Sequence, residues 1–466
     1  MACGVIGIAM REGKEHLIRD YARSGLVVVN HRGEESHGIA MVSPDGRIES
    51  RREKGLVRDS DVFDDPLNSG MFVGHTRYAT SSSNGIKNTQ PVVGGRKSDT
   101  PTAIVANGDL VNAYTELRAV VRTNKPMSDT RILGRLVKQK LKEHDDAVEA
   151  IRSAMLMCKG AYSLAILVGG KSPMIVAMRD PLGYMPLSIG ENDDGYFVAS
   201  ESVAFGSKYF NADHAELAPG HMAIITPQGL KVHTFAQADR TQHCWFQWVY
   251  MAKPSSVIAG VSVYDVRETI GRKLAETYKI EVDFVSPVPD SGRIFTYGYA
   301  NATGVPMIEA LMRDRYEAKR SFMQDGTASR IAVARKKLDV MGADGRLRGK
   351  RLLIIDDSLV RGNTTKEAIA QLRRETGVAE VHVGIASPPI RHQCVYGLDF
   401  YKNELIAVGK STYEIASAIG ADSLHYLSSE DLVSAIGLQE RDICMACVNG
   451  SYAQKVELLT REEKRG

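Results

Sequence analysis

An apolar strand that ends in two acidic residues constrains the fold of this chain more than any other feature. The segment reads Arg351-Leu-Leu-Ile-Ile-Asp356-Asp357-Ser-Leu-Val-Arg361-Gly362-Asn-Thr364-Thr365. The apolar run is typical of a buried strand, and the glycine and hydroxyl residues mark a turn before a helix. Ligands of open α/β sheets bind outside the carboxyl ends of the strands, so we expect the two acids at a binding site.

The turn after this strand has the composition of an anion site. Backbone N–H groups at a helix start attract negative charge, and Thr364 and Thr365 add hydroxyl donors. A P-loop is excluded, because the turn lacks its Gly-Lys-Ser/Thr sequence. A simple helix cap is the alternative, but it does not explain why Asp356 and Asp357 directly follow the strand.

The two halves of the chain have different patterns. In the first half we expect strands over 3–9, 70–74, 103–106, 163–168, 174–179 and 222–226, and helices over 14–27, 112–123, 129–144 and 146–157. Such segregated elements are typical of an α+β domain. After a polar linker at 236–243, residues 245–251 form a strand or a helix that joins the domains. Strands expected over 282–286, 352–355 and 381–386 then alternate with helices over 294–303 and 365–375, which predicts a parallel sheet.

Composition limits the function classes. At 466 residues the length favours about two to four domains, and 43% hydrophobic with 25% charged residues is ordinary for a globular protein. A net charge of +3 indicates no nucleic-acid partner. No apolar run approaches the ~18 residues of a membrane span, and no secretory signal pattern is present, so we expect a cytoplasmic protein without a membrane partner.

Cys3 opens the apolar run Cys3-Gly-Val-Ile-Gly-Ile-Ala. A small hydrophobe in an edge strand is the plain interpretation. If Cys3 became residue one, however, its α-amino group, with an ordinary pKa of about 7.7–8.0, would be a base beside its own thiol. Met1 and Ala2 precede it, so we expect both to be removed as a short propeptide.

Three further segments, read with Cys3, resemble the N-terminal-nucleophile (Ntn) glutamine amidotransferases. They are His31-Arg-Gly-Glu-Glu-Ser-His-Gly38, Gly74-His-Thr-Arg77-Tyr-Ala-Thr80 and Ala106-Asn107-Gly108-Asp-Leu110. Residues 351–365 resemble the loop of type I phosphoribosyltransferases that binds phosphoribosyl pyrophosphate (PRPP), and the turn at 287–293 supports this. Together with residues 250–255 and 387–397, they make the chain from Cys3 to about Tyr452 similar to the amidophosphoribosyltransferase family.

The resemblance implies a fold and a reaction. An α+β Ntn glutaminase domain of stacked antiparallel sheets between helices is expected over 3–238. An α/β phosphoribosyltransferase domain with a parallel sheet and a C-terminal cluster-binding segment is expected over 245–452. Glutamine hydrolysis would supply ammonia to PRPP, giving 5-phosphoribosylamine, glutamate and pyrophosphate, the first committed step of purine synthesis. The family also implies inhibition by purine nucleotides and a dimer or tetramer.

The family roles fall on named residues. Cys3 would be the nucleophile, Asn107 and Gly108 the oxyanion hole, and Arg77 and Asp129 the partners of the glutamine carboxylate and ammonium. Taken singly, the last two would read as a surface ion pair. Around Mg²⁺ and PRPP the resemblance places Ser291, Asp356, Asp357, Arg361, Gly362, Thr364, Thr365 and the loop residue Arg320.

Four of the six cysteines match the ligands of a [4Fe–4S] cluster found in one subgroup of the family: Cys244, Cys394, Cys444 and Cys447. A zinc site or simple buried thiols are the alternatives. Cys158 is not one of these four ligands, and we expect it to be a buried thiol within a helix.

The sequence departs from the family in three places. The loop at 315–322 has an extra residue and lacks the usual glycine, Asn363 replaces a threonine, and Ala106 replaces a histidine. Two rival interpretations remain. One is a non-catalytic, PRPP-binding iron–sulfur regulator with an inactive glutaminase domain. The other is an amidotransferase with a different acceptor, which the acid pair and its turn do not favour.

Overall fold

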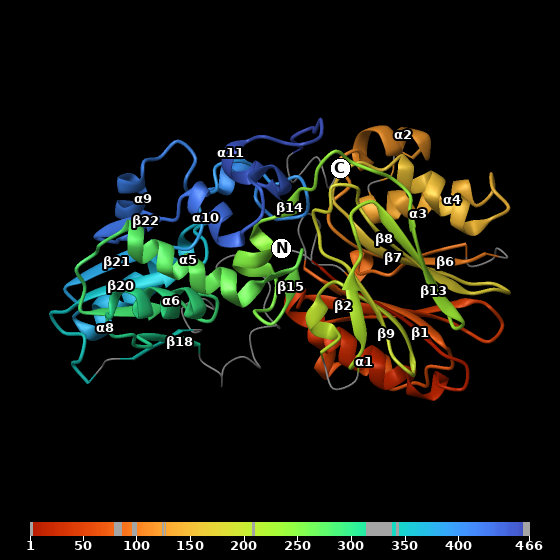
Figure 1. Cartoon of the computed structure of the whole chain (residues 1–466), viewed down its shortest axis with the longest axis horizontal. Coiled ribbons are helices and arrows are strands. Elements are labelled where there is room, and N and C mark those ends of the chain that lie inside the picture. The colour runs from red at the N-terminus through yellow and green to blue at the C-terminus, as the bar shows by residue number, and fades with distance from the viewer. Residues whose placement is uncertain are drawn as a thin grey trace.

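The structure is a computed structural model that describes residues 3–78, 86–95, 100–123, 125, 127–206, 210–313, 338–341 and 344–459. Two lobes lie side by side (Figure 1), one coloured red to yellow-green and the other green to blue, with β14 and β15 between them. Among the described residues, no helix combines the length and the apolar character needed to cross a membrane.

The first lobe is built on two antiparallel sheets. The seven-stranded sheet has the order β11-β9-β10-β1-β4-β2-β3, with β1 (Gly4–Met10), β2 (Ser36–Val42), β3 (Ile48–Lys54), β4 (Met71–Arg77), β9 (Ser188–Glu191), β10 (Gly195–Ala199) and β11 (Asp213–Glu216). The six-stranded sheet has the order β13-β12-β8-β7-β6-β5, with β5 (Val92–Gly94), β6 (Thr102–Asn107), β7 (Ser163–Val168), β8 (Met174–Arg179), β12 (His221–Thr226) and β13 (Gly229–Thr234).

Helices cover the outer faces of both sheets. α1 (Ile18–Val29) packs on the seven-stranded sheet, while α3 (Asp129–Lys140) and α4 (Ala147–Leu156) pack on the six-stranded one. Side chains alternate along β1: Val5 and Ala9 join the core between the sheets, and Ile6 and Ile8 face α1. Both faces of β1 are therefore buried, and the expected architecture of stacked antiparallel sheets between helices is confirmed.

The second lobe contains a parallel sheet of order β17-β20-β21-β22, formed by β17 (Phe284–Pro287), β20 (Arg351–Asp356), β21 (Glu380–Ile385) and β22 (Ser423–Tyr426). Its helices are α5 (Val263–Thr277), α6 (Arg293–Thr303), α8 (Asn363–Thr376), α9 (Thr412–Ile419), α10 (Ser429–Ile436) and α11 (Ala446–Asn449). Leu353 and Ile355 of β20 pack with α5 and α6, whereas Leu352 and Ile354 pack with α8 and α9. This two-sided cover explains the continuous apolar run of β20.

Short elements complete the chain. The small strand pairs are β14 (His243–Cys244) with β23 (Ile443–Cys444), β15 (Val257–Ile258) with β16 (Val261–Ser262), and β18 (Leu311–Arg313) with β19 (Leu338–Val340). Single helical turns are η1 (Glu15–Leu17), η2 (Asn30–Arg32), η3 (Val57–Asp59), η4 (Asp61–Phe63), η5 (Ile86–Asn88), η7 (Ser202–Ala204), η10 (Lys402–Glu404) and η11 (Glu440–Asp442). Two π-helical turns are η6 (Ala113–Leu117) and η8 (Gln247–Met251).

Some local expectations were wrong in detail. The helix expected over 112–123 is the π turn η6 followed by the short α2 (Arg118–Val120). Cys158 lies just after α4 rather than inside a helix, although it is buried and its thiol donates to the Ala154 carbonyl at 3.4 Å. The strand or helix expected over 245–251 is helical, since η8 spans Gln247–Met251 as a π turn, so the helical alternative is confirmed.

Candidate active sites

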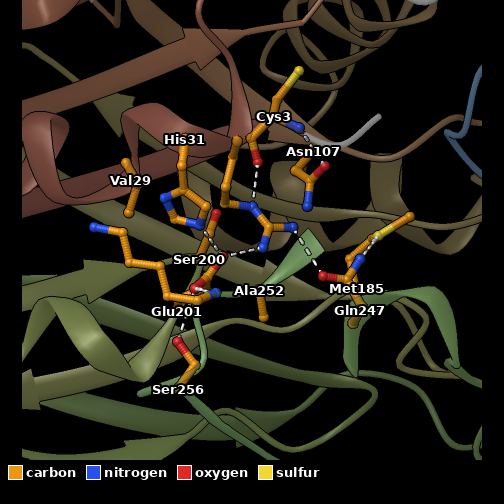
Figure 2. Close-up of polar contacts among 12 residues, drawn as sticks. Cys3, Val29, His31, Asn107, Met185, Ser200, Glu201, Gln247, Ala252 and Ser256 are labelled. Carbon is orange, nitrogen blue, oxygen red and sulfur yellow. Dashed lines mark hydrogen bonds and ion pairs between the residues drawn. The ribbon is translucent and has the colours of Figure 1, made fainter. Parts of the chain in front are cut away.

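Cys3 and Asn107 meet where the two sheets of the first lobe face each other. Cys3 immediately precedes β1, and Asn107 ends β6. The Cys3 backbone N–H donates to Asn107 Oδ1 at 2.9 Å, as Figure 2 shows. Asn107 is 1% exposed, and its Nδ2 has no hydrogen-bond partner among the described residues. A buried amide donor without a partner costs free energy, so it is suited to an oxyanion that forms beside Cys3.

The Cys3 thiol lies in mixed surroundings. Burial raises its pKa, while the Tyr78 backbone N–H, which donates to the thiol, and the positive charges of Arg77 and Arg32 lower it. Arg77 ends β4 and is buried. The structure thus brings the predicted nucleophile and the predicted carboxylate-binding arginine together.

Gly108 and Asp129 complete this centre. Gly108 has φ +113°, and a Cβ there would lie 2.2 Å from the Ala161 carbonyl oxygen, so only glycine fits. Asp129 begins α3, and its Oδ2 accepts from the Leu110 N–H at 3.2 Å. Asp129 is therefore fixed to the same loop that carries Asn107 and Gly108.

The second lobe closes against this loop. Gly397 has φ +121°, and a Cβ there would lie 3.1 Å from the Gly108 Cα atom. That spacing is tighter than ordinary van der Waals contact, so a side chain at Gly397 would press on the loop of the other lobe that carries Asn107 and Gly108.

His75 of β4 lies beneath the same centre. Its Nε2 is 3.2 Å from the Ala106 carbonyl, and burial followed by the charge of Arg77 lowers its pKa to about 3. A histidine in an unfolded chain titrates near pH ~6.5. As the pH falls, the unfolded state therefore takes up a proton on His75 before the folded state does. We expect the stability that His75 contributes to be complete above pH ~6.5 and to be lost as the pH falls toward about 3.

The His75→Asn variant tests this expectation, because asparagine does not titrate. Urea unfolding followed from pH 7 to pH 4 should show a shallower loss of stability in the variant, by up to about 1.4 kcal/mol per pH unit. His233→Asn, at an exposed position of β13, is the control and should keep the slope of the wild type. Equal slopes in all three proteins would contradict the assignment.

The acid pair forms the second centre, at the carboxyl end of β20. Asp356 and Asp357 are 9% and 5% exposed. Burial, followed by the neighbouring charge of Asp357, raises the pKa of Asp356. Burial also raises the pKa of Asp357, which the Ser291 hydroxyl, as a hydrogen-bond donor, partly opposes. Ser291, predicted from a distant segment, therefore contacts this pair.

The carboxylates of Asp356 and Asp357 are buried and lie close to the Ser291 hydroxyl. Because burial disfavours the unpaired carboxylate anions, these oxygens are suited to bind a divalent cation. The donors in hand are two carboxylates and a hydroxyl, which suit Mg²⁺ with the remaining positions left to substrate or water. No group of three or more His, Cys, Asp or Glu side chains is arranged to hold a metal ion in the described part of the chain.

The predicted phosphate turn leads from β20 into α8. Gly362 precedes α8 with φ +78°, and Thr364 and Thr365 lie in its first turn, where backbone N–H groups have no intrahelical partner. The guanidinium of Arg361 forms ion pairs with Glu404 and Asp399, so its charge is already paired in this structure. Arg320 lies outside the described residues.

Tyr250 lies within electrostatic range of the acid pair. It belongs to η8 at the junction of the lobes. Burial raises the pKa of its phenol, and the charges of Asp357, Tyr78 and Asp356 add to this effect. The same Tyr78 whose phenol acts on Tyr250 donates its backbone N–H to the Cys3 thiol.

The four cysteines gather at the junction of the lobes. Cys244 and Cys444 are register partners in the β14–β23 pair. Cys447 accepts from the Trp245 indole N–H at 3.3 Å, and after burial, its neighbours Cys394, Cys244 and Cys444 raise the pKa of its thiol further. The structure describes all six cysteines, and no disulfide joins any two of them.

Sequence patterns missed a polar network behind Cys3. Arg32, which lies inside one of the quoted motifs, donates to the Cys3 carbonyl, to Glu201 and to Gln247. Glu201 and Gln247 stand in no motif, and their partner is more than 160 positions away, so no local signal could have found them.

Comparisons with known proteins agree with both lobes. A model of the glutamine amidotransferase domain family matches residues 75–207. The chain is 36% identical to the amidophosphoribosyltransferase of Archaeoglobus fulgidus, over 97% of this chain and 98% of that protein. It is 37% identical to the Bacillus subtilis amidophosphoribosyltransferase, over 97% of this chain and 94% of that protein.

Two solved structures also match. The glutamine PRPP amidotransferase of B. subtilis, complexed with ADP and GMP, is similar with a TM-score of 0.85 and 35% identity, covering 98% of this chain and 99% of that one. A structure described as the allosteric regulatory enzyme of purine biosynthesis has a TM-score of 0.88 and 34% identity, covering 99% of both chains.

Proposed function

The chain belongs to the amidophosphoribosyltransferase family, and on this premise we propose how its own residues carry out the two half-reactions. The family's activity is that of a glycosyltransferase with a glutamine-hydrolysing domain: ammonia from glutamine replaces the pyrophosphate of PRPP, giving 5-phosphoribosylamine. We assign glutamine hydrolysis to a domain over 3–238 and the PRPP reaction to a domain over 245–452.

The first half-reaction starts at Cys3. Its thiolate attacks the glutamine amide carbon, and its freed α-amino group takes the thiol proton and passes it to the leaving ammonia. Asn107 Nδ2 and the Gly108 N–H receive the oxyanion, while Arg77 and Asp129 hold the carboxylate and ammonium of glutamine. Water then cleaves the glutamyl thioester. The observation that carries this assignment is the Asn107 Nδ2 beside Cys3, which has no hydrogen-bond partner in the part of the chain that the structure describes.

The second half-reaction takes place at the acid pair. Asp356, Asp357 and Ser291 would hold Mg²⁺ with PRPP, and the ion would neutralise the leaving pyrophosphate. Gly362, Thr364 and Thr365 bind the 5-phosphate at the start of α8. We retain Arg361 and Arg320 as further PRPP contacts, although Arg361 must first leave Glu404 and Asp399. Ammonia has to arrive uncharged, so it needs a water-poor passage, which we place beside Tyr250.

A direct assay tests this function. Anaerobically purified protein receives PRPP and Mg²⁺ with either glutamine or an ammonium salt, and pyrophosphate release is measured. Both nitrogen sources should support release, and glutamine should give glutamate as well. A non-catalytic regulator would bind PRPP without releasing pyrophosphate from either mixture.

We also propose that Cys244, Cys394, Cys444 and Cys447 hold a [4Fe–4S] cluster. The support is that the four thiols lie at one junction. In a [4Fe–4S] cluster each iron takes one thiolate, so the four sulfur atoms need not converge on a single ion. Inhibition by purine nucleotides, a cytoplasmic location and a dimer or tetramer are proposed by analogy with the family. The complex of the B. subtilis relative with ADP and GMP supports the first of these.

The cluster predicts a specific loss. Cys447→Ser should remove iron, acid-labile sulfide and the visible absorbance of the anaerobic protein together. Cys158→Ser is the matched control, because Cys158 is equally buried and serine keeps the donation to the Ala154 carbonyl. Zinc without sulfide in the wild type would contradict the cluster and favour the Cys₄ zinc alternative.

A further inference from the structure

A buried arginine ties Cys3 to the second lobe. Arg32 is 1% exposed, and its Nε donates to the Cys3 carbonyl at 3.0 Å. Its Nη2 donates to Gln247 Oε1 at 3.1 Å, and its Nη1 pairs with Glu201. Figure 2 labels Cys3, Glu201 and Gln247, the three residues whose oxygens accept these hydrogen bonds. A guanidinium with fixed donors holds three partners in one plane, so its position sets that of the Cys3 carbonyl.

Glu201 is the partner that fixes Arg32. It is also 1% exposed and lies between β10 and η7. Oε1 contacts His31 Nε2 at 2.9 Å as well as Arg32, whereas Oε2 accepts from the Lys253 N–H at 2.9 Å and the Ser256 hydroxyl at 2.8 Å. The two oxygens therefore serve opposite lobes: one holds the arginine behind Cys3, and the other holds the segment that leads into α5.

The charge state of this carboxylate agrees with that arrangement. Burial opposes its ionisation, yet Arg32 and His31 keep the pKa of Glu201 well below its usual range. A buried charge pair is sensitive to the loss of either partner, because the remaining charge is left without compensation.

We propose that Glu201 is a positioning residue for glutamine hydrolysis, which orients the Cys3 nucleophile through Arg32 and anchors that orientation to Lys253 and Ser256 of the second lobe. The inference rests on the proposed role of Cys3. A displacement of about 1 Å at a reacting group costs on the order of 10²-fold in rate, so loss of this anchor affects the chemical step. The hydrogen bonds of Arg32 and Glu201 lead to Cys3, His31, Gln247, Lys253 and Ser256, so we expect loss of the network to alter the chemical step more than the binding of glutamine.

Glu201→Gln is the sharpest test. An amide has the size of a carboxylate, but only its oxygen accepts, so one side of the network loses its acceptor. Ser202→Ala is the matched control: Ser202 sits at the same junction and joins the lobes through Val257, receiving its N–H at 2.8 Å, without touching Arg32. Glutamine hydrolysis and ammonia-driven pyrophosphate release are measured for each protein.

For Glu201→Gln we expect kcat of glutamine hydrolysis to fall by about ten- to a hundredfold, with KM for glutamine and ammonia-driven turnover within about twofold of the wild type. Ser202→Ala should leave all three unchanged. A kcat within about twofold of the wild type, or an equal fall in ammonia-driven turnover, would overturn the proposal.

If Glu201→Gln does not fold, Ser256→Ala decides the question, because it removes one Oε2 contact and keeps the ion pair. A fall of about three- to tenfold in kcat, absent from Ser202→Ala, supports the anchor, and no change overturns it. Failure of the proposed function looks different, since the wild type itself would then neither hydrolyse glutamine nor release pyrophosphate.

Discussion

Cys3→Ala abolishes glutamine-driven turnover and leaves ammonia-driven turnover intact. We expect a loss of at least about 10⁴-fold with glutamine, because removal of a nucleophile leaves only binding and the oxyanion donors. With an ammonium salt, pyrophosphate release should stay within about twofold of the wild type, because the acid pair lies in the other lobe. Parallel pyrophosphate and glutamate assays measure both losses.

The control for this variant is Cys158→Ala, which removes a buried thiol that has no assigned role in either half-reaction and should keep both activities. The intact mass of the mature wild type adds an independent check on the amine base. A mass that retains Ala2 would contradict the role of the α-amino group, because Cys3 would then carry an ordinary peptide bond. Equal loss with both nitrogen sources would contradict the assignment of Cys3 itself.

Asp357→Asn should impair the PRPP half-reaction and spare glutamine hydrolysis, which is the reverse of the result expected for Cys3→Ala. Pyrophosphate release should fall by about 10²–10³-fold with either nitrogen source. The reason is that asparagine removes a negative charge that would hold Mg²⁺, and the ion would stabilise the transition state. Glutamine hydrolysis should persist. The folded state should not suffer, because a neutral side chain relieves the burial and repulsion that raise the pKa of both acids.

Asp283→Asn is the matched control for Asp357. Asp283 lies at the other end of the same strand pair, where its Oδ2 accepts from the Arg351 N–H at 2.8 Å. It should keep both activities. If Asp283→Asn lost as much activity as Asp357→Asn, the effect would reflect the strand rather than a binding site at its carboxyl end.

Local chemistry made much of the fold predictable. The expected strands at 163–168 and 174–179 match β7 and β8, and the acid pair ends β20 as expected. In each case a continuous apolar run is bounded by turn residues. β3 was missed because its Arg51 and Arg52 side chains give it the appearance of a polar loop, although it pairs fully with β2 at the edge of the sheet.

The centres themselves were predictable as sets of residues but not as arrangements. Motifs named Cys3, Asn107 and Ser291, and the structure places each beside a predicted partner. Glu201 could not be found in this way, because its function depends on contacts with Arg32 and Ser256, far apart in the sequence. Long-range pairs leave no spacing pattern in the chain.

The meeting of Gly397 with Gly108 limits how this chain can change. A side chain at Gly397 would press on Gly108 of the other lobe, and Gly108 cannot itself accept a side chain, because a Cβ there would meet the Ala161 carbonyl. A glutaminase lobe exchanged for that of a relative must therefore bring a compatible loop, or the recipient's Cys394–Gly397 segment must be exchanged with it. We therefore expect a change at this contact in one lobe to require a matching change in the other.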